Sequence, residues 1–214
     1  MGTVKQAVEA LGTYGGEPRP RTTQTARTLQ NDRLLPVNEG KWVKHVGATH
    51  LATLILAVAA TPKPIDATRT ALTWGRLTPG GKAIDRDWDD PNRQRFVLAE
   101  ILTGCIGMVW KEAGRGPLTD KIVQSHFDIT LNRPHAIVLF NGEITEYLPF
   151  GATPDLAEFP GFHRVCRIPG TVIRSVALAL HEGPQHNALL ARQPDIKPNP
   201  YRDPASVLSA PLAR

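Results

Sequence analysis

Polar side chains with paired hydrogen-bonding groups recur at helical spacing between residues 24 and 31. Gln24, Arg27, Thr28 and Asn31 are three or four positions apart, so a helix over residues 22–33 would place them on one face. Guanidinium and carboxamide groups can form bidentate hydrogen bonds with base edges in the major groove of DNA. The pattern therefore predicts a helix that reads base sequence, with Gln24 and Arg27 as the principal base contacts.

Further candidate contacts flank this helix. Thr23 extends its polar face, and we expect Trp42 either to stack in a hairpin that follows or to anchor that hairpin to the core. Basic side chains beside a reading helix typically approach phosphates, which position the protein without specifying sequence. The expected phosphate contacts are Arg19, Arg21, Arg33, Lys41 and Lys44.

The charge distribution agrees with a nucleic-acid partner for the first part of the chain. The 214 residues carry a net charge of +5, but residues 1–82 contain 11 Lys or Arg against 5 Asp or Glu, and residues 83–214 contain 14 against 15. A positive surface raises affinity for phosphate backbones and speeds encounter with them. We therefore place double-stranded DNA binding in residues 1–82.

No part of the sequence predicts a membrane or secreted protein. The longest apolar run, residues 51–60, is half the length that a bilayer crossing needs, and no basic-then-apolar leader stands at the start. Cys105 and Cys166 form neither a CxxC pair nor a disulfide framework, as is typical of a reducing compartment. We expect a cytoplasmic protein.

Periodicity and turn residues predict the elements of the first block. Thr3 and Gln6 form a capping box for a helix that should stop at Gly12, and an Asn-Glu-Gly turn divides a hairpin. Residues 78–81, Thr-Pro-Gly-Gly, are expected to be a linker. The predicted elements are helices over residues 3–11, 22–33, 48–60 and 65–77 and a hairpin over residues 37–46.

The second block predicts a long helix, a small antiparallel sheet and a further helix. Asn141 and Gly142 are a hairpin signal between two of the strands, and residues 183–214 form a Pro-rich tail. The expected elements are helices over residues 91–112 and 169–181, and strands over residues 127–131, 136–140, 144–147 and 162–168. The fold class is α+β, with a DNA-binding module in residues 1–82 and a dimerisation or partner-binding domain in residues 83–182.

Three segments carry a resemblance to a known family of modules. TVKQAVEALG (residues 3–12), TTQTARTLQNDRLLP (residues 22–36) and VNEGKWVKHV (residues 37–46) are similar in order to the winged-helix, helix-turn-helix modules of the MerR and excisionase type. The resemblance implies that the second helix enters the major groove and that the hairpin wing lies along the backbone. The chain departs from the pattern in the longer connection between the first two helices and in lacking a Tyr-Arg pair after the wing.

Other chemistry has little support in the sequence. Asp85, Asp87 and Asp89 have the spacing that opens a calcium loop, but Asp90 stands where that loop needs Gly. The histidines never fall at HxxxH or HExxH spacing, and nucleotide-binding and hydrolase motifs are absent from the sequence. Cys166 with His163 is a weak nucleophile candidate, because strand alternation would put the two on opposite faces. We expect no metal, no cofactor and no catalytic activity.

The function predicted is a sequence-specific transcriptional regulator that binds DNA as a homodimer, of the kind encoded by phages or mobile elements. A single short reading helix gives limited specificity, which paired half-sites commonly remedy. Two alternatives remain open. One is a DNA-packaging, partition or recombination accessory protein, and the other is an inhibitor that docks on a host protein complex through the hairpin of residues 136–147 or the long helix.

Overall fold

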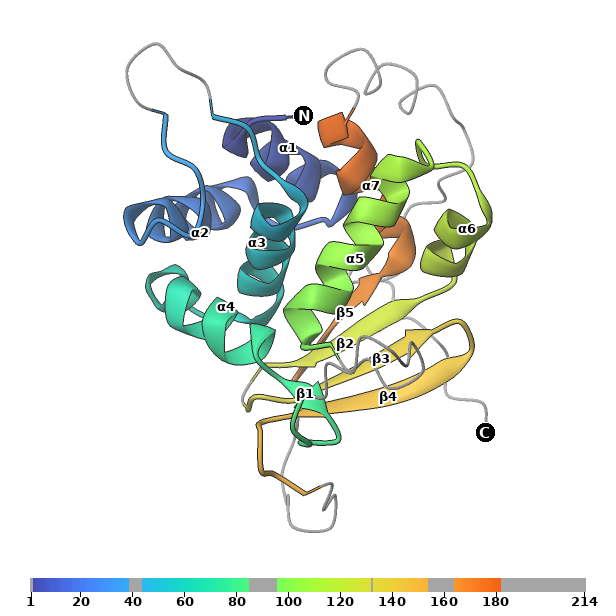
Figure 1. Ribbon diagram of the computed structural model, residues 1–214. Helices are drawn as coiled ribbons and strands as arrows, with labels where there is room; N and C mark the ends of the chain where they lie inside the picture. The colour runs from blue at the N-terminus through green and yellow to red at the C-terminus, as the bar shows by residue number, and fades with distance from the viewer. Residues whose placement is uncertain (1, 39–43, 85–95, 132, 154–163, 182–214) are drawn as a thin grey trace, which may run out of the picture.

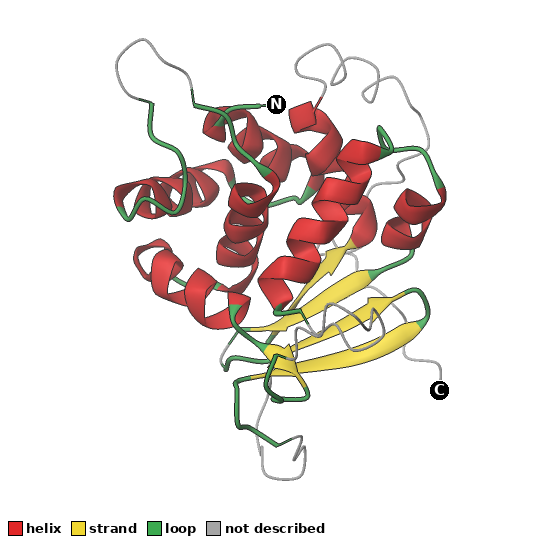
Figure 2. Cartoon of the chain, viewed as in Figure 1, coloured by secondary structure: helices red, strands yellow, loops and turns green. Residues whose placement is uncertain are grey.

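Helices stack on one side of an antiparallel β-sheet (Figure 1). The computed structural model describes residues 2–38, 44–84, 96–131, 133–153 and 164–181. Seven α-helices and five strands lie within these ranges, which confirms the predicted α+β class. Figure 2 shows that the helices form a layer over the strands, and the hydrophobic core lies both among the helices and between them and the sheet.

The sheet has the strand order β1-β4-β3-β2-β5, and every neighbouring pair is antiparallel. At the β3–β4 turn, Asn141 (φ 53°) and Gly142 (φ 82°) both have positive φ, as the expected hairpin turn requires. The turn signal in the sequence is therefore confirmed. The strands are β1 (Thr78–Pro79), β2 (His126–Thr130), β3 (Ala136–Phe140), β4 (Glu143–Leu148) and β5 (Val165–Pro169).

All six predicted helices have counterparts among the described residues. The helix over residues 48–60 has the predicted ends, and the others have different ends. The capping box of the first helix is confirmed: the Gln6 backbone N–H donates to Thr3 Oγ1 at 3.3 Å and the Thr3 N–H donates to Gln6 Oε1 at 2.8 Å. The stop expected at Gly12 is wrong, because a single glycine costs a helix only about 1 kcal/mol and the chain remains helical to Tyr14. The helices are α1 (Val4–Tyr14), α2 (Arg19–Asn31), α3 (Ala48–Ala60), the 3₁₀ turn η1 (Pro64–Asp66), α4 (Ala67–Gly75), α5 (Leu98–Lys111), α6 (Pro117–Val123) and α7 (Gly170–His181).

The segment expected to be a linker is part of the sheet. Thr78 and Pro79 pair with Leu148 and Tyr147 of β4, so the first block supplies an edge strand to the second. Gly81 is buried at φ 68°, and a side chain there would collide with the backbone at Ala152. The linker prediction is wrong because a strand of two residues carries no periodic signal of its own.

The blocks on either side of residue 82 share one hydrophobic core. Helix α1 packs against α7, and α3 packs against α5. The Trp74 indole N–H donates to the Thr130 carbonyl at 2.9 Å, and the Leu98 N–H donates to the Leu77 carbonyl at 3.0 Å. Residues 1–82 and 83–182 are therefore not separate packing units.

The centre of the expected wing, residues 39–43, lies outside the described residues. The stretches that flank it, residues 36–38 and 44–47, are not strands. The Lys44 backbone N–H donates to the Asn38 side-chain oxygen at 3.1 Å, so a side-chain bond replaces a ladder bond at this point. The Pro-rich tail from residue 183 onward also lies outside the description. No described helix has the length and apolar character that a bilayer crossing needs.

Candidate nucleic-acid interface

Helix α2 separates a small buried face from a polar exposed face. Its buried residues are Thr22, Thr25, Ala26 and Leu29, which pack toward the other helices. Pro20 is tolerated because it lies in the first turn, where backbone N–H groups have no helical partner. The helix therefore starts at Arg19, three residues earlier than predicted, and this adds Arg19 to its surface.

The exposed face of α2 carries the side chains that the sequence singled out. Gln24, Arg27 and Asn31 are exposed, and Thr28 is half-buried with its hydroxyl donating to the Gln24 carbonyl at 3.2 Å. Within the described part of the chain, the side chains of Gln24 and Arg27 make no hydrogen bond or ion pair. Helix α2 itself contains no Asp or Glu. A guanidinium and a carboxamide are therefore exposed on this face, and no other described residue uses their donors and acceptors.

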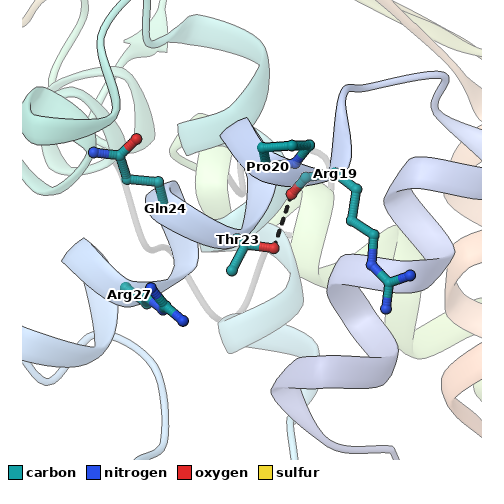
Figure 3. A pocket seen from close by; sticks show the side chains of 5 residues that line it. All are labelled: Arg19, Pro20, Thr23, Gln24 and Arg27. Atoms are coloured by element: carbon teal, nitrogen blue, oxygen red, sulfur yellow. Dashed lines mark hydrogen bonds between the residues drawn. The ribbon is translucent and has the colours of Figure 1, made fainter.

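Arg19 and Thr23 lie on the side of α2 that faces α1. The Thr23 hydroxyl donates to the Arg19 carbonyl at 2.8 Å, and Figure 3 shows the Arg19 side chain extending away from Gln24 and toward the neighbouring helix. There Arg19 forms an exposed ion pair with Glu9 of α1 at 2.7 Å. A pair at this degree of exposure contributes about 0–1 kcal/mol, so Arg19 can exchange Glu9 for a phosphate at little cost.

Arg21 does not belong to the exposed face. Its guanidinium donates to the Val58 and Thr61 carbonyls at the end of α3, and its other terminal nitrogen lies 2.9 Å from Glu17 Oε2. A cation at these carbonyls complements the negative end of the α3 dipole. Arg21 therefore holds α2 against α3, and the expected phosphate contact is corrected to a structural one.

A groove between α1 and α2 gathers three cations. It has a volume of about 560 Å³, and Lys5, Arg19 and Arg27 line it together with Thr23 and Asn38. A shallower depression of about 510 Å³, lined by Arg19, Thr23, Gln24 and Arg27, continues it along the outer face of α2 (Figure 3). Sequence reasoning missed Lys5, because only the packing of α1 on α2 brings it beside Arg19 and Arg27. The sequence did offer one signal, because Lys5 lies off the apolar stripe of α1 and could therefore be expected at the surface.

The remaining predicted contacts lie beyond the end of α2. Arg33 is exposed at φ 59°, two residues after the helix. Lys44 is exposed on the far side of the segment where the wing was expected, whereas Lys41 and Trp42 lie outside the described residues. The structure therefore brings together Arg19, Thr23, Gln24 and Arg27 on one surface, with Arg33 at its carboxyl end.

Hydrogen bonds link a hydroxyl, an imidazole and a carboxylate in the sheet region, away from α2. Thr130 Oγ1 lies 3.0 Å from His135 Nδ1, and His135 Nε2 lies 2.8 Å from Glu146 Oε1. These are the group types of a nucleophilic triad, but Thr130 is 4% exposed and His135 6%. The Thr130 carbonyl also accepts the Trp74 indole bond. We interpret these hydrogen bonds as structural bonds that hold the β2–β3 turn against β4.

Both cysteines are free thiols in poorly solvated surroundings. Burial raises the pKa of the Cys105 thiol to about 12 and that of Cys166 to about 11. Neither thiol is ionised near neutral pH, so neither is an activated nucleophile. His163 and the candidate calcium ligands Asp85, Asp87 and Asp89 lie outside the described residues. Among the described residues, no three His, Cys, Asp or Glu side chains are grouped to hold a metal ion.

Comparison of the chain with protein-family models, with curated proteins and with solved structures finds no match.

Proposed function

We propose that the protein binds double-stranded DNA through the exposed face of α2 and acts as a sequence-specific regulator in the form of a homodimer. The observation that carries the proposal is the guanidinium of Arg27 beside the carboxamide of Gln24, neither with a side-chain partner among the described residues, on a helix with no carboxylate. These two side chains suit G and A edges, respectively, in the major groove. The finer proposal of a winged-helix module rests on the order of α1, α2 and α3 along the chain.

The α1–α2 groove supports a division of labour within the interface. Lys5 and Arg19 lie to the side of the reading face, where a phosphate strand would pass if α2 entered the groove of a duplex. Each phosphate contact contributes about 0.9 to the slope of log K against log salt. We therefore assign base contacts to Gln24 and Arg27, and backbone contacts to Lys5, Arg19 and Arg33.

The test is selection of bound sequences from random duplex DNA, followed by fluorescence anisotropy with Arg27→Ala, Lys5→Ala and a control, Arg115→Ala. Arg27→Ala should cost about 1–3 kcal/mol on the selected site and less on random DNA. Lys5→Ala should weaken both duplexes alike and lower the salt slope by about 1. Arg115 is an exposed arginine between α5 and α6, and α6 lies on the other side of the molecule from α2 (Figure 1), so removal of Arg115 controls for net charge.

Several results would contradict the proposal. Absence of binding to any duplex at low salt would exclude it, and equal losses for Arg27→Ala and Arg115→Ala would show a diffuse charge effect. Sedimentation with and without the selected duplex tests the homodimer. Protection away from promoters, with transcription unchanged on deletion of the protein, would favour a packaging or recombination role over regulation.

A further inference from the structure

A further pocket lies between α5 and the hairpin β3–β4. These elements lie away from α2 (Figure 1). Its volume of about 290 Å³ is close to the lower end of the range for small-molecule sites, about 300–1,000 Å³. On the helix side it is lined by Glu100, Ile101, Gly104 and Met108, which share one face of α5. Because α5 carries a glycine at the centre of this face, it leaves space above the sheet.

The sheet side of the pocket is formed by side chains that point toward the helices. Val138 of β3 pairs with Thr145 of β4, and Phe140 pairs with Glu143 at the hairpin end. Val138 is buried, Phe140 is half-buried and Glu143 is exposed, so the pocket deepens from the hairpin turn toward the core. It therefore has an apolar floor and an acidic mouth.

Among the described residues, the centre of this face of α5 does not fill the space above the sheet. A Cβ atom added at Gly104 would meet no heavy atom within 4 Å. The Tyr147 side chain lines the pocket from β4 and is 4% exposed. Burial raises the pKa of its hydroxyl to about 12, so the hydroxyl stays protonated near neutral pH and can donate to a bound acceptor.

The lining combines aromatic rings with a carboxylate. Phe96, Phe140 and Tyr147 contribute three rings, and Phe96 is 39% exposed at the rim. Glu143 forms no ion pair or hydrogen bond through its side chain within the described residues. The ring faces attract alkylated ammonium groups through their quadrupoles, and a nearby carboxylate adds direct charge attraction.

We propose that this pocket binds a small organic cation, an alkylated ammonium group carried on an aromatic or apolar body. The body lies on Val138 and Met108 beside Gly104, and the ammonium group lies at the mouth near Phe140 and Glu143. The described lining residues belong to α5, to β3 and β4 and to Phe96 just before α5, so the proposal stands independently of DNA binding by α2.

The test compares two probes of the same shape by heteronuclear NMR: para-hydroxyphenyl trimethylammonium and its neutral isostere para-tert-butylphenol. The cation should bind about tenfold more tightly, since the aromatic rings and the Glu143 carboxylate attract the ammonium group and not the neutral isostere. The first amide shifts should be those of Gly104 and Thr145. Glu143→Gln should weaken the cation several-fold and leave the isostere unchanged.

A matched pair of glycines on α5 tests the location. Gly104 and Gly107 both have open space at Cβ, but only Gly104 lines the pocket. Gly104→Leu should therefore weaken both probes at least tenfold, whereas Gly107→Leu should change neither by more than about twofold. Far-ultraviolet circular dichroism checks that each variant is folded. If Gly104→Leu does not fold, Glu143→Gln still tests the site.

Two results would overturn the proposal. Equal affinity for the two probes would show that the ammonium group is not what the pocket recognises. Binding that survives Gly104→Leu in a folded variant would place the probe elsewhere.

Discussion

Two arginines six positions apart on α2 are expected to give opposite phenotypes. Arg21 donates from one terminal nitrogen to the Val58 and Thr61 carbonyls and pairs with Glu17 through the other, whereas Arg27 is exposed and unpaired within the described residues. Arg21→Ala should therefore destabilise the fold with little effect on DNA binding. Arg27→Ala should do the reverse.

The magnitude for Arg21 follows from its partners. A hydrogen bond from a charged donor contributes about 1.5–3 kcal/mol, and because both carbonyls share one nitrogen we count that contribution once. The ion pair with Glu17 is partly exposed, at 33% and 24% for the two side chains, and adds at most about 0.5 kcal/mol. We expect Arg21→Ala to lower the free energy of unfolding by about 2–3 kcal/mol. Arg21→Lys keeps the charge but loses the planar guanidinium, so its free energy of unfolding should lie between those of the parent protein and Arg21→Ala.

The assay is urea unfolding followed by tryptophan fluorescence, with anisotropy on the selected duplex under conditions where each variant is fully folded. A shift in midpoint at constant slope reports stability alone. Arg21→Ala should bind DNA within about twofold of the parent protein, because its guanidinium is turned toward α3. The reasoning is refuted if Arg21→Ala unfolds like the parent and loses tenfold or more in DNA affinity.

The remaining predictions concern close packing and thiol chemistry. Gly170 is the first residue of α7, and a Cβ atom there would collide with the Ile122 carbonyl of α6. Gly170→Ala should therefore destabilise the protein by about 1–3 kcal/mol or more, measured by the same unfolding assay. Gly104→Ala, which meets no atom, should be neutral or stabilising, and a loss like that of Gly170→Ala would contradict the packing argument. The Cys166 thiol should alkylate slowly at pH 8, at a rate that keeps rising with pH toward its pKa of about 11, and a plateau below pH 9 measured with iodoacetamide would contradict that value.

Several elements of this protein were predictable from the sequence because their signals are local. The apolar stripe of α3 predicted a helix over Ala48–Ala60, and the short apolar run of residues 136–140 predicted β3. Asn141 with Gly142 predicted the turn between β3 and β4. The capping box at Thr3 joins residues only three positions apart. Each signal depends on neighbours within one or two turns of chain, which the sequence lists directly.

Only the tertiary structure decided what lies beside what. Pairing of Thr78–Pro79 with β4 joins positions about seventy residues apart, and no local pattern marks a strand of two residues. The same holds within the candidate interface. The spacing of Gln24, Arg27 and Asn31 along one helix could be read from the sequence. The contact of Arg21 with the end of α3 and the position of Lys5 beside Arg19 depend on how the helices pack. Local periodicity fixes which face a side chain occupies, whereas its partners are set by contacts between distant segments.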